Sequence, residues 1–335
     1  MINPEYIEDF VGFYPGTHFW IDRVLDWNSD EAAKRLSGMT AEIGYMKDAQ
    51  SFKAAVTIEG LVLLHIGKLA STRPHMGIPA EREAAVQWWD EYLDHIHALQ
   101  ILFETVSLRQ GHAYNYVSVV ELTPEDTCTF GMFEWQPVRG NHSNGRTMLS
   151  DRFAARDWLR HKAEMFTPKE VTDHWSFNYV TLSIANLDEI FSNFEALTAH
   201  PIKIKWFSFI AKSKTAFGRG DFRVAFMLSW FVIESACIDT YYSLNPSVPR
   251  PTATTTNHVT MHVAQQDIFA KQAIDQNTFD AINQLRKIRN KLIHQPHQTI
   301  CTQNDSIKAH DTALKFACAN LNFGVNMLLT HNVKY

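Results

Sequence analysis

The most informative stretch of the chain reads LRKIRNKLIHQP, residues 285–296. Its apolar residues Leu285, Ile288 and Leu292 recur at helical spacing, so one side of a helix would pack against a core. Pro296 ends this helix, because the residue before a proline is pushed out of helical geometry. The stretch therefore predicts the last turns of an amphipathic helix.

The other side of the same helix carries Arg289, Asn290 and His294. On a helical wheel of about 100° per residue, Asn290 and His294 point away from the core, and Arg289 lies at the edge of the apolar side. Arginine can hold phosphate oxygens through two parallel hydrogen bonds, and histidine can exchange a proton near neutral pH. The spacing alone is unspecific, since Arg156 and His161 repeat it, but the asparagine straight after the arginine makes the combination rarer.

Residues 201–335 show helical periodicity on both sides of this stretch. Asp221 can cap one helix, and the Pro- and Thr-rich residues 245–257 predict a loop after it. The helices expected here span 202–217, 221–244, 264–295 with a break signal near 275–277, and 306–329. Four helices joined by loops predict an all-α four-helix bundle.

Residues 1–200 mix strand patterns and helix patterns. The expected elements are a strand or strand pair at 54–67, a helix at 81–109, a hairpin of 114–122 with 127–135, a loop at 140–145, helices at 151–165 and 187–197, and a strand at 175–184. The fold class expected for the chain is thus an α+β N-terminal domain of no recognised family, residues 1–200. The helical bundle, residues 201–335, follows it, and the chain is mainly helical overall.

Charge is divided unevenly between these two parts. Residues 1–200 hold 16 Lys and Arg against 28 Asp and Glu, a net of −12, while residues 201–335 hold 15 against 8, a net of +7. Much of the positive charge gathers around the motif, at Arg286, Lys287, Arg289 and Lys291. Such a patch predicts an anionic partner such as RNA, although solvated side chains without a partner would give the same count.

Over about residues 200–330 the chain resembles the HEPN superfamily, the higher eukaryotes and prokaryotes nucleotide-binding domain. The order of the helices matches. The second helix has an aromatic-rich segment with one acid, Glu234 in SWFVIESA. The third helix ends in LRKIRNKLIHQP, close to the family's pattern of an arginine, a polar residue, a few spacers and a histidine. The resemblance does not extend to the N-terminal part.

The resemblance implies a metal-independent endoribonuclease that acts as a homodimer through the C-terminal bundle. The implied roles are catalysis for Arg289, Asn290 and His294, RNA binding for Arg286, Lys287 and Lys291, and support for Glu234, for which we favour a structural role with Arg289 as candidate partner. The 2′-OH of RNA would attack the phosphate and leave a 2′,3′-cyclic phosphate and a 5′-OH end. Members occur in bacterial toxins and in antiphage or abortive-infection systems, so an antitoxin or a phage-derived trigger is a further expected partner.

Composition and spacing argue against other classes of protein. The apolar stretches are too short to span a bilayer, and the acidic start MINPEYIEDF does not look like a signal peptide, so no membrane partner is expected. The four cysteines lack the spacing of a zinc site, and His258 and His262 have no suitably spaced acidic ligand. We therefore expect a cytoplasmic protein with reduced thiols, without a cofactor and without a metal.

Two functions of different class stay open at this point. The first is the endoribonuclease. The second is a non-catalytic module that dimerises or binds RNA through the bundle, while the N-terminal domain acts as a sensor. His294 would then be a surface histidine near a helix C-terminus, where a cation is favoured. A nuclease held inactive by the acidic N-terminal part is a third possibility.

Overall fold

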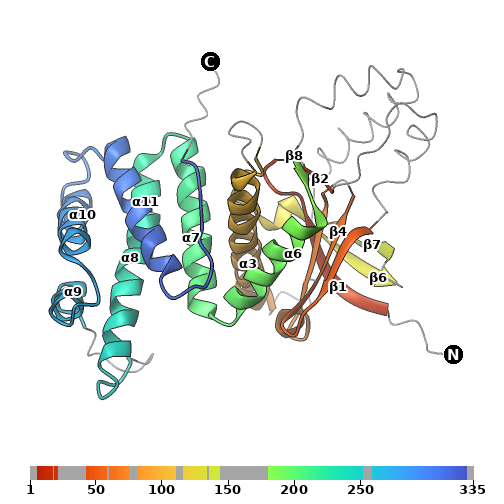
Figure 1. Ribbon diagram of the computed structural model, residues 1–335, viewed down its shortest axis with the longest axis horizontal. Coiled ribbons are helices and arrows are strands. Elements are labelled where there is room, and N and C mark those ends of the chain that lie inside the picture. Colours follow the sequence, from red (N-terminus) through yellow and green to blue (C-terminus); the bar gives the residue numbers. More distant parts are fainter. Residues whose placement is uncertain are drawn as a thin grey trace. The chain divides into compact units, whose positions relative to one another are not determined.

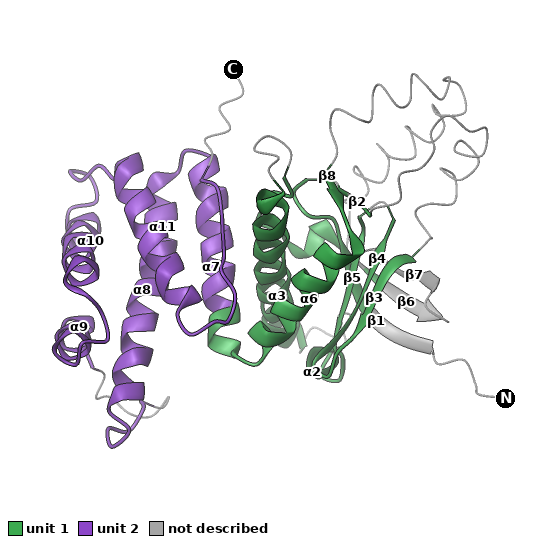
Figure 2. Ribbon diagram, viewed as in Figure 1, with its two compact units in different colours: residues 1–204 green, residues 205–335 purple. Residues whose placement is uncertain are grey.

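The computed structural model describes residues 6–17, 19–21, 43–58, 60–74, 81–110, 116–133, 136–143, 180–251 and 259–329. The chain divides into two compact units, residues 1–204 and 205–335 (Figure 2), and the division falls within helix α7, Pro201–Gly218. The boundary expected from the sequence, 200/201, lies four residues earlier. Within the described residues the protein is mainly helical and has an antiparallel sheet in unit 1 (Figure 1).

Unit 1 is built on a six-stranded antiparallel sheet with the order β3-β4-β5-β1-β6-β7, beside a short parallel pair of β2 and β8. The strands are β1 Tyr6–Phe13, β2 Phe19–Ile21, β3 Ile43–Asp48, β4 Phe52–Thr57, β5 Val62–Ile66, β6 Thr127–Phe133, β7 Gln136–Ser143 and β8 Val180–Leu182. Strands β4 and β5 pair from Phe52 opposite Ile66 to Val56 opposite Val62, which confirms the strand pair expected near 54–67.

Two helices, α3 Arg82–Arg109 and α6 Ile184–Thr198, cover one face of this sheet (Figure 1). Aromatic rings fill the layer between them: Phe103 of α3 contacts Phe19 and Phe191, and Phe52 of β4 contacts Phe191 and Phe194. Burying such rings is the main source of stability in a layer of this kind. Both helices are confirmed where the sequence predicted them.

The expected hairpin of 114–122 with 127–135 is wrong. Residues 127–133 form β6, but this strand pairs with β1 and β7, and β7 also occupies 140–143, where a loop was expected. Residues 116–122 form no strand, because side chains of α3 accept the hydrogen bonds of their backbone N–H groups. The helix expected at 151–165 and residues 175–179 of the expected strand lie outside the described residues.

The helices of the C-terminal part are α7, α8 Phe222–Leu244, α9 Met261–Ala270, α10 Gln276–His294 and α11 Gln303–Cys318. They are five among the described residues, not four, because the third expected helix is divided into α9 and α10. Gln272 adopts a left-handed backbone (φ 60°), and the Ala273 N–H donates back to Ile268 O, which ends α9. Asp275 then caps α10 by accepting from the Thr278 N–H at 2.7 Å.

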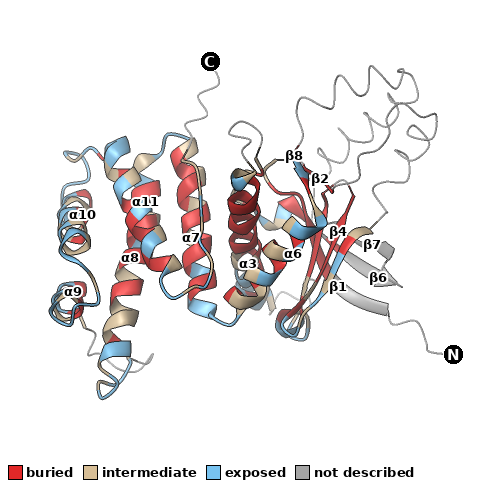
Figure 3. Ribbon diagram, viewed as in Figure 1, coloured by how far each residue is buried: buried red, intermediate tan, exposed pale blue. Residues whose placement is uncertain are grey.

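The last helix is shorter than expected, since α11 ends at Cys318 and not at 329. Asn320 has a left-handed backbone (φ 61°), a conformation that asparagine tolerates better than most residues. Helix α8 packs against α9, α10 and α11, and α10 also packs against α9 and α11. Helices α7, α8 and α11 each carry buried residues along their length (Figure 3). The all-α class is thus as predicted, while the number and lengths of the helices differ.

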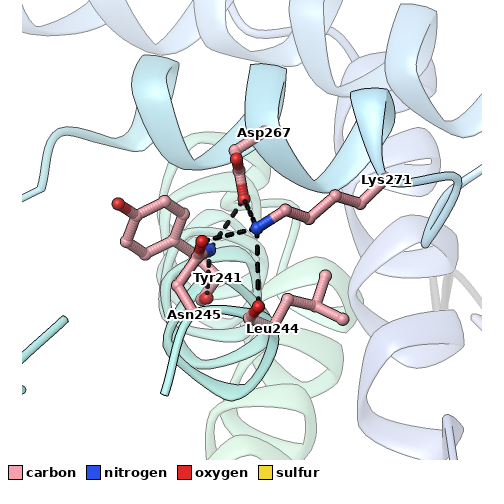
Figure 4. A network of polar contacts seen from close by, with 5 residues as sticks. All are labelled: Tyr241, Leu244, Asn245, Asp267 and Lys271. Carbon is pink, nitrogen blue, oxygen red and sulfur yellow. Dashed lines mark hydrogen bonds and ion pairs between the residues drawn. The ribbon is translucent and has the colours of Figure 1, made fainter. Parts of the chain in front are cut away.

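A polar network joins the end of α8 to α9 (Figure 4). The Asn245 side-chain amide donates to Tyr241 O and to Asp267 Oδ2, both at 2.8 Å, and Lys271 Nζ lies 3.1 Å from Asp267 Oδ2. Lys271 also donates to the Leu244 carbonyl at 3.4 Å. These contacts satisfy carbonyls that the last turn of α8 leaves without helical partners.

Among the residues that the structure describes, no helix is both long enough and apolar enough to cross a membrane.

Candidate functional site

Helix α10 carries the motif, and its apolar side fixes the helix on the bundle. Ile282, Leu285 and Leu292 are buried, while Ile288, expected on the same side, is half-buried. The last turn closes with the Gln295 N–H donating to Lys291 O at 2.8 Å, and Pro296 follows. The helix therefore ends where the sequence predicted, just after the motif histidine.

The three motif residues have the exposure that the helical wheel predicts. Asn290 and His294 are exposed, and Arg289 is half-buried. Arg289 Nη1 donates to Asn290 Oδ1 at 3.2 Å, and the Arg289 Nε is buried without a hydrogen-bond partner among the described residues. The structure thus brings Arg289 and Asn290 into contact and leaves His294 open to solvent in the last turn.

The positive charges of α10 are not paired with carboxylates in the part of the chain that the structure describes. Within the described residues, none of the four cations Arg286, Lys287, Arg289 and Lys291 takes part in an ion pair. Elsewhere in the C-terminal part, by contrast, Arg250 pairs with Asp239 at 2.6 Å. An arginine without a carboxylate keeps its donors available for an anionic ligand.

Arg286 repeats the arrangement of Arg289 one turn earlier. Its Nη2 donates to Asn283 Oδ1 at 3.4 Å, its Nε is buried without a partner among the described residues, and its side chain is half-buried. Lys287 and Lys291 are exposed. Sequence reasoning missed Asn283, although its position three residues before Arg286 is a signal that could have found it.

Glu234 does not pair with Arg289, so the candidate partner is wrong. Its carboxylate accepts from the indole Nε1 of Trp230, one turn earlier on α8, at 3.1 Å, and no ion pair with Arg289 is present among the described residues. Burial, and secondly the charge of Glu234, raises the pKa of the Cys237 thiol to about 12, so this thiol stays protonated. These contacts favour the structural role for Glu234.

The loop after His294 is held by the first turn of α8. Arg223 Nη2 donates to Pro296 O at 2.9 Å and to Thr299 O at 3.0 Å, and Cys301 Sγ donates to Phe222 O at 3.5 Å. Arg223 therefore positions the chain next to the motif. No local sequence pattern could have shown this, because the contact joins residues more than 70 positions apart.

The sequence also raised candidates outside α10. His258, Arg156 and His161 lie outside the described residues. Among the residues that are described, no three His, Cys, Asp or Glu side chains gather as a metal site would require.

The surface of α10 therefore combines one exposed imidazole, two half-buried guanidinium groups held by asparagines, and two exposed lysines. This set can bind phosphate groups and can exchange a proton next to one of them. Comparison of the chain with models of protein families, with curated proteins and with solved structures found no match.

Proposed function

We propose that the protein is a metal-independent endoribonuclease whose active site is formed by Arg289, Asn290 and His294 from two copies of α10. The observation that carries the proposal is the exposed His294 in the last turn of a helix whose arginines have no carboxylate partner among the described residues. A histidine that only stabilised the helix end would not need two half-buried guanidinium groups on the same helix. The resemblance to HEPN proteins supports the same assignment.

The roles follow from the contacts. Arg289, oriented by its hydrogen bond to Asn290, would donate to the non-bridging oxygens and stabilise the charge that develops in the transition state. His294 would take the proton of the 2′-OH or give a proton to the 5′-oxygen that leaves. The expected products are a 2′,3′-cyclic phosphate and a 5′-OH end.

The proposal includes a homodimer, because α10 itself carries one imidazole for two proton transfers. Attack by the 2′-OH requires a base, and departure of the 5′-oxygen requires an acid, whereas α10 supplies one exposed imidazole at its end. A two-fold axis beside His294 would bring a second imidazole and a second guanidinium to the same phosphate. On the resemblance, we place such an enzyme in antiphage defence or in a toxin system, with an antitoxin or a phage-derived trigger as a regulating partner.

The test is cleavage of labelled RNA by the full chain in excess EDTA. We expect His294→Ala and Arg289→Ala to lower the cleavage rate by about 10²–10⁴-fold, because each removes a group that acts in the transition state. His297→Ala is the matched control: it removes another exposed imidazole, three residues further along and outside the helix, and should leave the rate unchanged. A single 2′-deoxy substitution at the cleaved linkage should block the reaction.

Circular dichroism and chromatographic size would establish that each variant is folded and keeps its oligomeric state. Intact RNA at high concentrations of the folded wild-type protein, together with RNA binding or a stable dimer, would contradict the proposal of an active nuclease. It would favour the non-catalytic module or the nuclease held inactive by the N-terminal part. Equal loss of cleavage in His294→Ala and His297→Ala would also contradict the assigned role of His294.

A further inference from the structure

We propose that Arg286 and Asn283 form a second phosphate subsite on α10, which holds the phosphate next to the scissile one in the same RNA strand. The inference rests on the proposed function for the identity of the scissile phosphate at Arg289. Binding of the neighbouring phosphate does not itself require cleavage, so the two proposals can fail separately.

The first argument is the repetition along the helix. Arg286 contacts Asn283, and Arg289 contacts Asn290, so each guanidinium is held by a neutral amide of the same helix. The two arginines are three residues apart, about 4.5 Å along the helix axis, and therefore project from neighbouring turns. Two oriented guanidinium groups in succession suit a ligand that carries anionic groups in succession, as a nucleic-acid backbone does.

The second argument is the unsatisfied hydrogen bonding of Arg286. Its contact with Asn283 is long for a hydrogen bond, at 3.4 Å, and its Nε is buried without a partner among the described residues. Buried donors in proteins nearly always have an acceptor, so this N–H calls for a ligand or a water. A phosphate offers several charged oxygen acceptors, to which the Nη groups of this half-buried side chain can donate.

The third argument separates Arg286 from its basic neighbours. Lys287 and Lys291 are exposed, and a mobile ammonium group attracts RNA without fixing the position of one phosphate. Arg286 is half-buried and is contacted by Asn283, so its donors have a direction. The lysines should therefore attract all phosphates of the RNA alike, whereas Arg286 should bind one particular phosphate.

The experiment is a double-mutant cycle between protein and oligonucleotide. The probe is a single-stranded RNA made non-cleavable by one 2′-deoxy residue at the cleaved linkage, in which each neighbouring phosphate is replaced in turn by a neutral methylphosphonate. For the wild-type chain, one replacement adjacent to the cleaved linkage should weaken binding by about tenfold or more, the size of a hydrogen bond to a charged group. In Arg286→Gln the same replacement should have no further effect.

Lys287→Gln is the matched control, since it removes one positive charge from the next residue of the helix. Lys287→Gln should weaken the binding of every oligonucleotide in the series by about the same factor. The adjacent methylphosphonate should therefore still weaken binding by about tenfold in this variant. A uniform response of Arg286→Gln, like that of Lys287→Gln, would overturn the subsite. If the wild-type chain cleaves no RNA, the methylphosphonate is instead moved along the whole strand. A coupling to Arg286 at one position then shows that the phosphate subsite stands while the proposed function fails.

A second variant keeps the test valid if Arg286→Gln disturbs folding. Asn283→Asp places a carboxylate against the Arg286 guanidinium, at a spacing at which helical ion pairs form. The fold should be retained, because the two side chains already touch. The carboxylate would compete with the RNA phosphate, so the coupling should disappear, whereas Asn283→Ala should leave part of it. Full coupling in Asn283→Asp would overturn the proposal.

Discussion

Helices α3 and α10 each carry a row of polar side chains at almost the same spacing, and the rows have opposite environments. On α3 the row is His97, Gln100, Glu104 and Ser107; on α10 it is Asn283, Arg286, Asn290 and His294. The α3 row is fully buried, and each of its members accepts a hydrogen bond from a backbone N–H of residues 117–122. The α10 row is exposed or half-buried.

The difference shows how a polar row should be interpreted. On α3, the side chains replace a neighbouring strand: they satisfy an extended segment that would otherwise bury unpaired amides. On α10, the side-chain hydrogen bonds of the row among the described residues are asparagine–arginine contacts within the helix, and charged donors are left over there. A buried and satisfied row is therefore structural, whereas an open row with unpaired donors is a candidate for ligand binding.

The α3 row gives the largest expected effect on stability. Glu104 Oε2 accepts from the Val119 N–H at 2.8 Å in a fully buried position. Glu104→Ala would leave that N–H without an acceptor and should lower the free energy of unfolding by about 1–3 kcal/mol. Chemical denaturation followed by circular dichroism measures the change. RNA cleavage per folded molecule should not change.

The control for this variant is Glu91→Ala, which removes an exposed carboxylate from the same helix. Its free energy of unfolding should stay within about 0.5 kcal/mol of the wild-type value. Equal effects at the two positions would show that the backbone segment does not depend on α3, and the comparison of the two rows would lose its basis.

Local periodicity carried most of what could be predicted. The spacing of apolar residues is a property of a few turns, so α3, α6, α8 and the exposed face of α10 followed from it. The same holds for the exposure of Asn290 and His294. Their chemistry stays a prediction, because exposure alone does not show what a side chain binds.

Features that depend on a distant partner could not be predicted in this way. Residues 116–122 have the sequence of a strand, and Val117, Val119 and Leu122 are indeed buried. The same pattern arises when the side chains of a helix, and not a neighbouring strand, accept the hydrogen bonds of the backbone N–H groups. The acceptors of residues 116–122 are therefore not encoded within the neighbouring residues. The pairing of Glu234 with Arg289 failed for the opposite reason: the carboxylate accepts from Trp230, one turn earlier on its own helix, and this local contact could have been found from the spacing of the two residues.

Helix α11 provides a third case between the two rows. His310 is fully buried, and neither of its ring nitrogens has a hydrogen-bond partner among the described residues. Burial, and secondly the charge of Lys214, lowers the pKa of His310 to about 3, so its ring is neutral in the folded protein. Unlike the α3 row, this side chain is buried without compensation.

The expected consequence is a loss of stability in acid. An unfolded histidine binds its proton at pH values below about 6.5, whereas folded His310 does not until about pH 3. The neutral ring of His310 therefore does not reduce the free energy of unfolding above about pH 6.5, and this free energy falls as the pH decreases below that value. The change in the free energy of unfolding should approach about 1.4 kcal/mol per pH unit. This slope is measured by chemical denaturation of the wild type between pH 7 and pH 5. His310→Leu, which removes the titrating group, is measured in the same way for comparison. A slope that is the same in both proteins would contradict the assignment.

The smallest effect is expected at the junction of α8 and α9, where polar groups are satisfied but close to solvent (Figure 4). Asn245→Ala removes the donations to Tyr241 O and Asp267 Oδ2. Water can replace these partners, so the free energy of unfolding should fall by only about 0.5–1 kcal/mol, less than for Glu104→Ala. Chemical denaturation of the two variants under the same conditions gives the comparison. A larger decrease for Asn245→Ala than for Glu104→Ala would contradict this expectation. Burial of a hydrogen-bonded polar group would then not determine its contribution to the free energy of unfolding, and the α3 row and the α10 row would differ in charge alone.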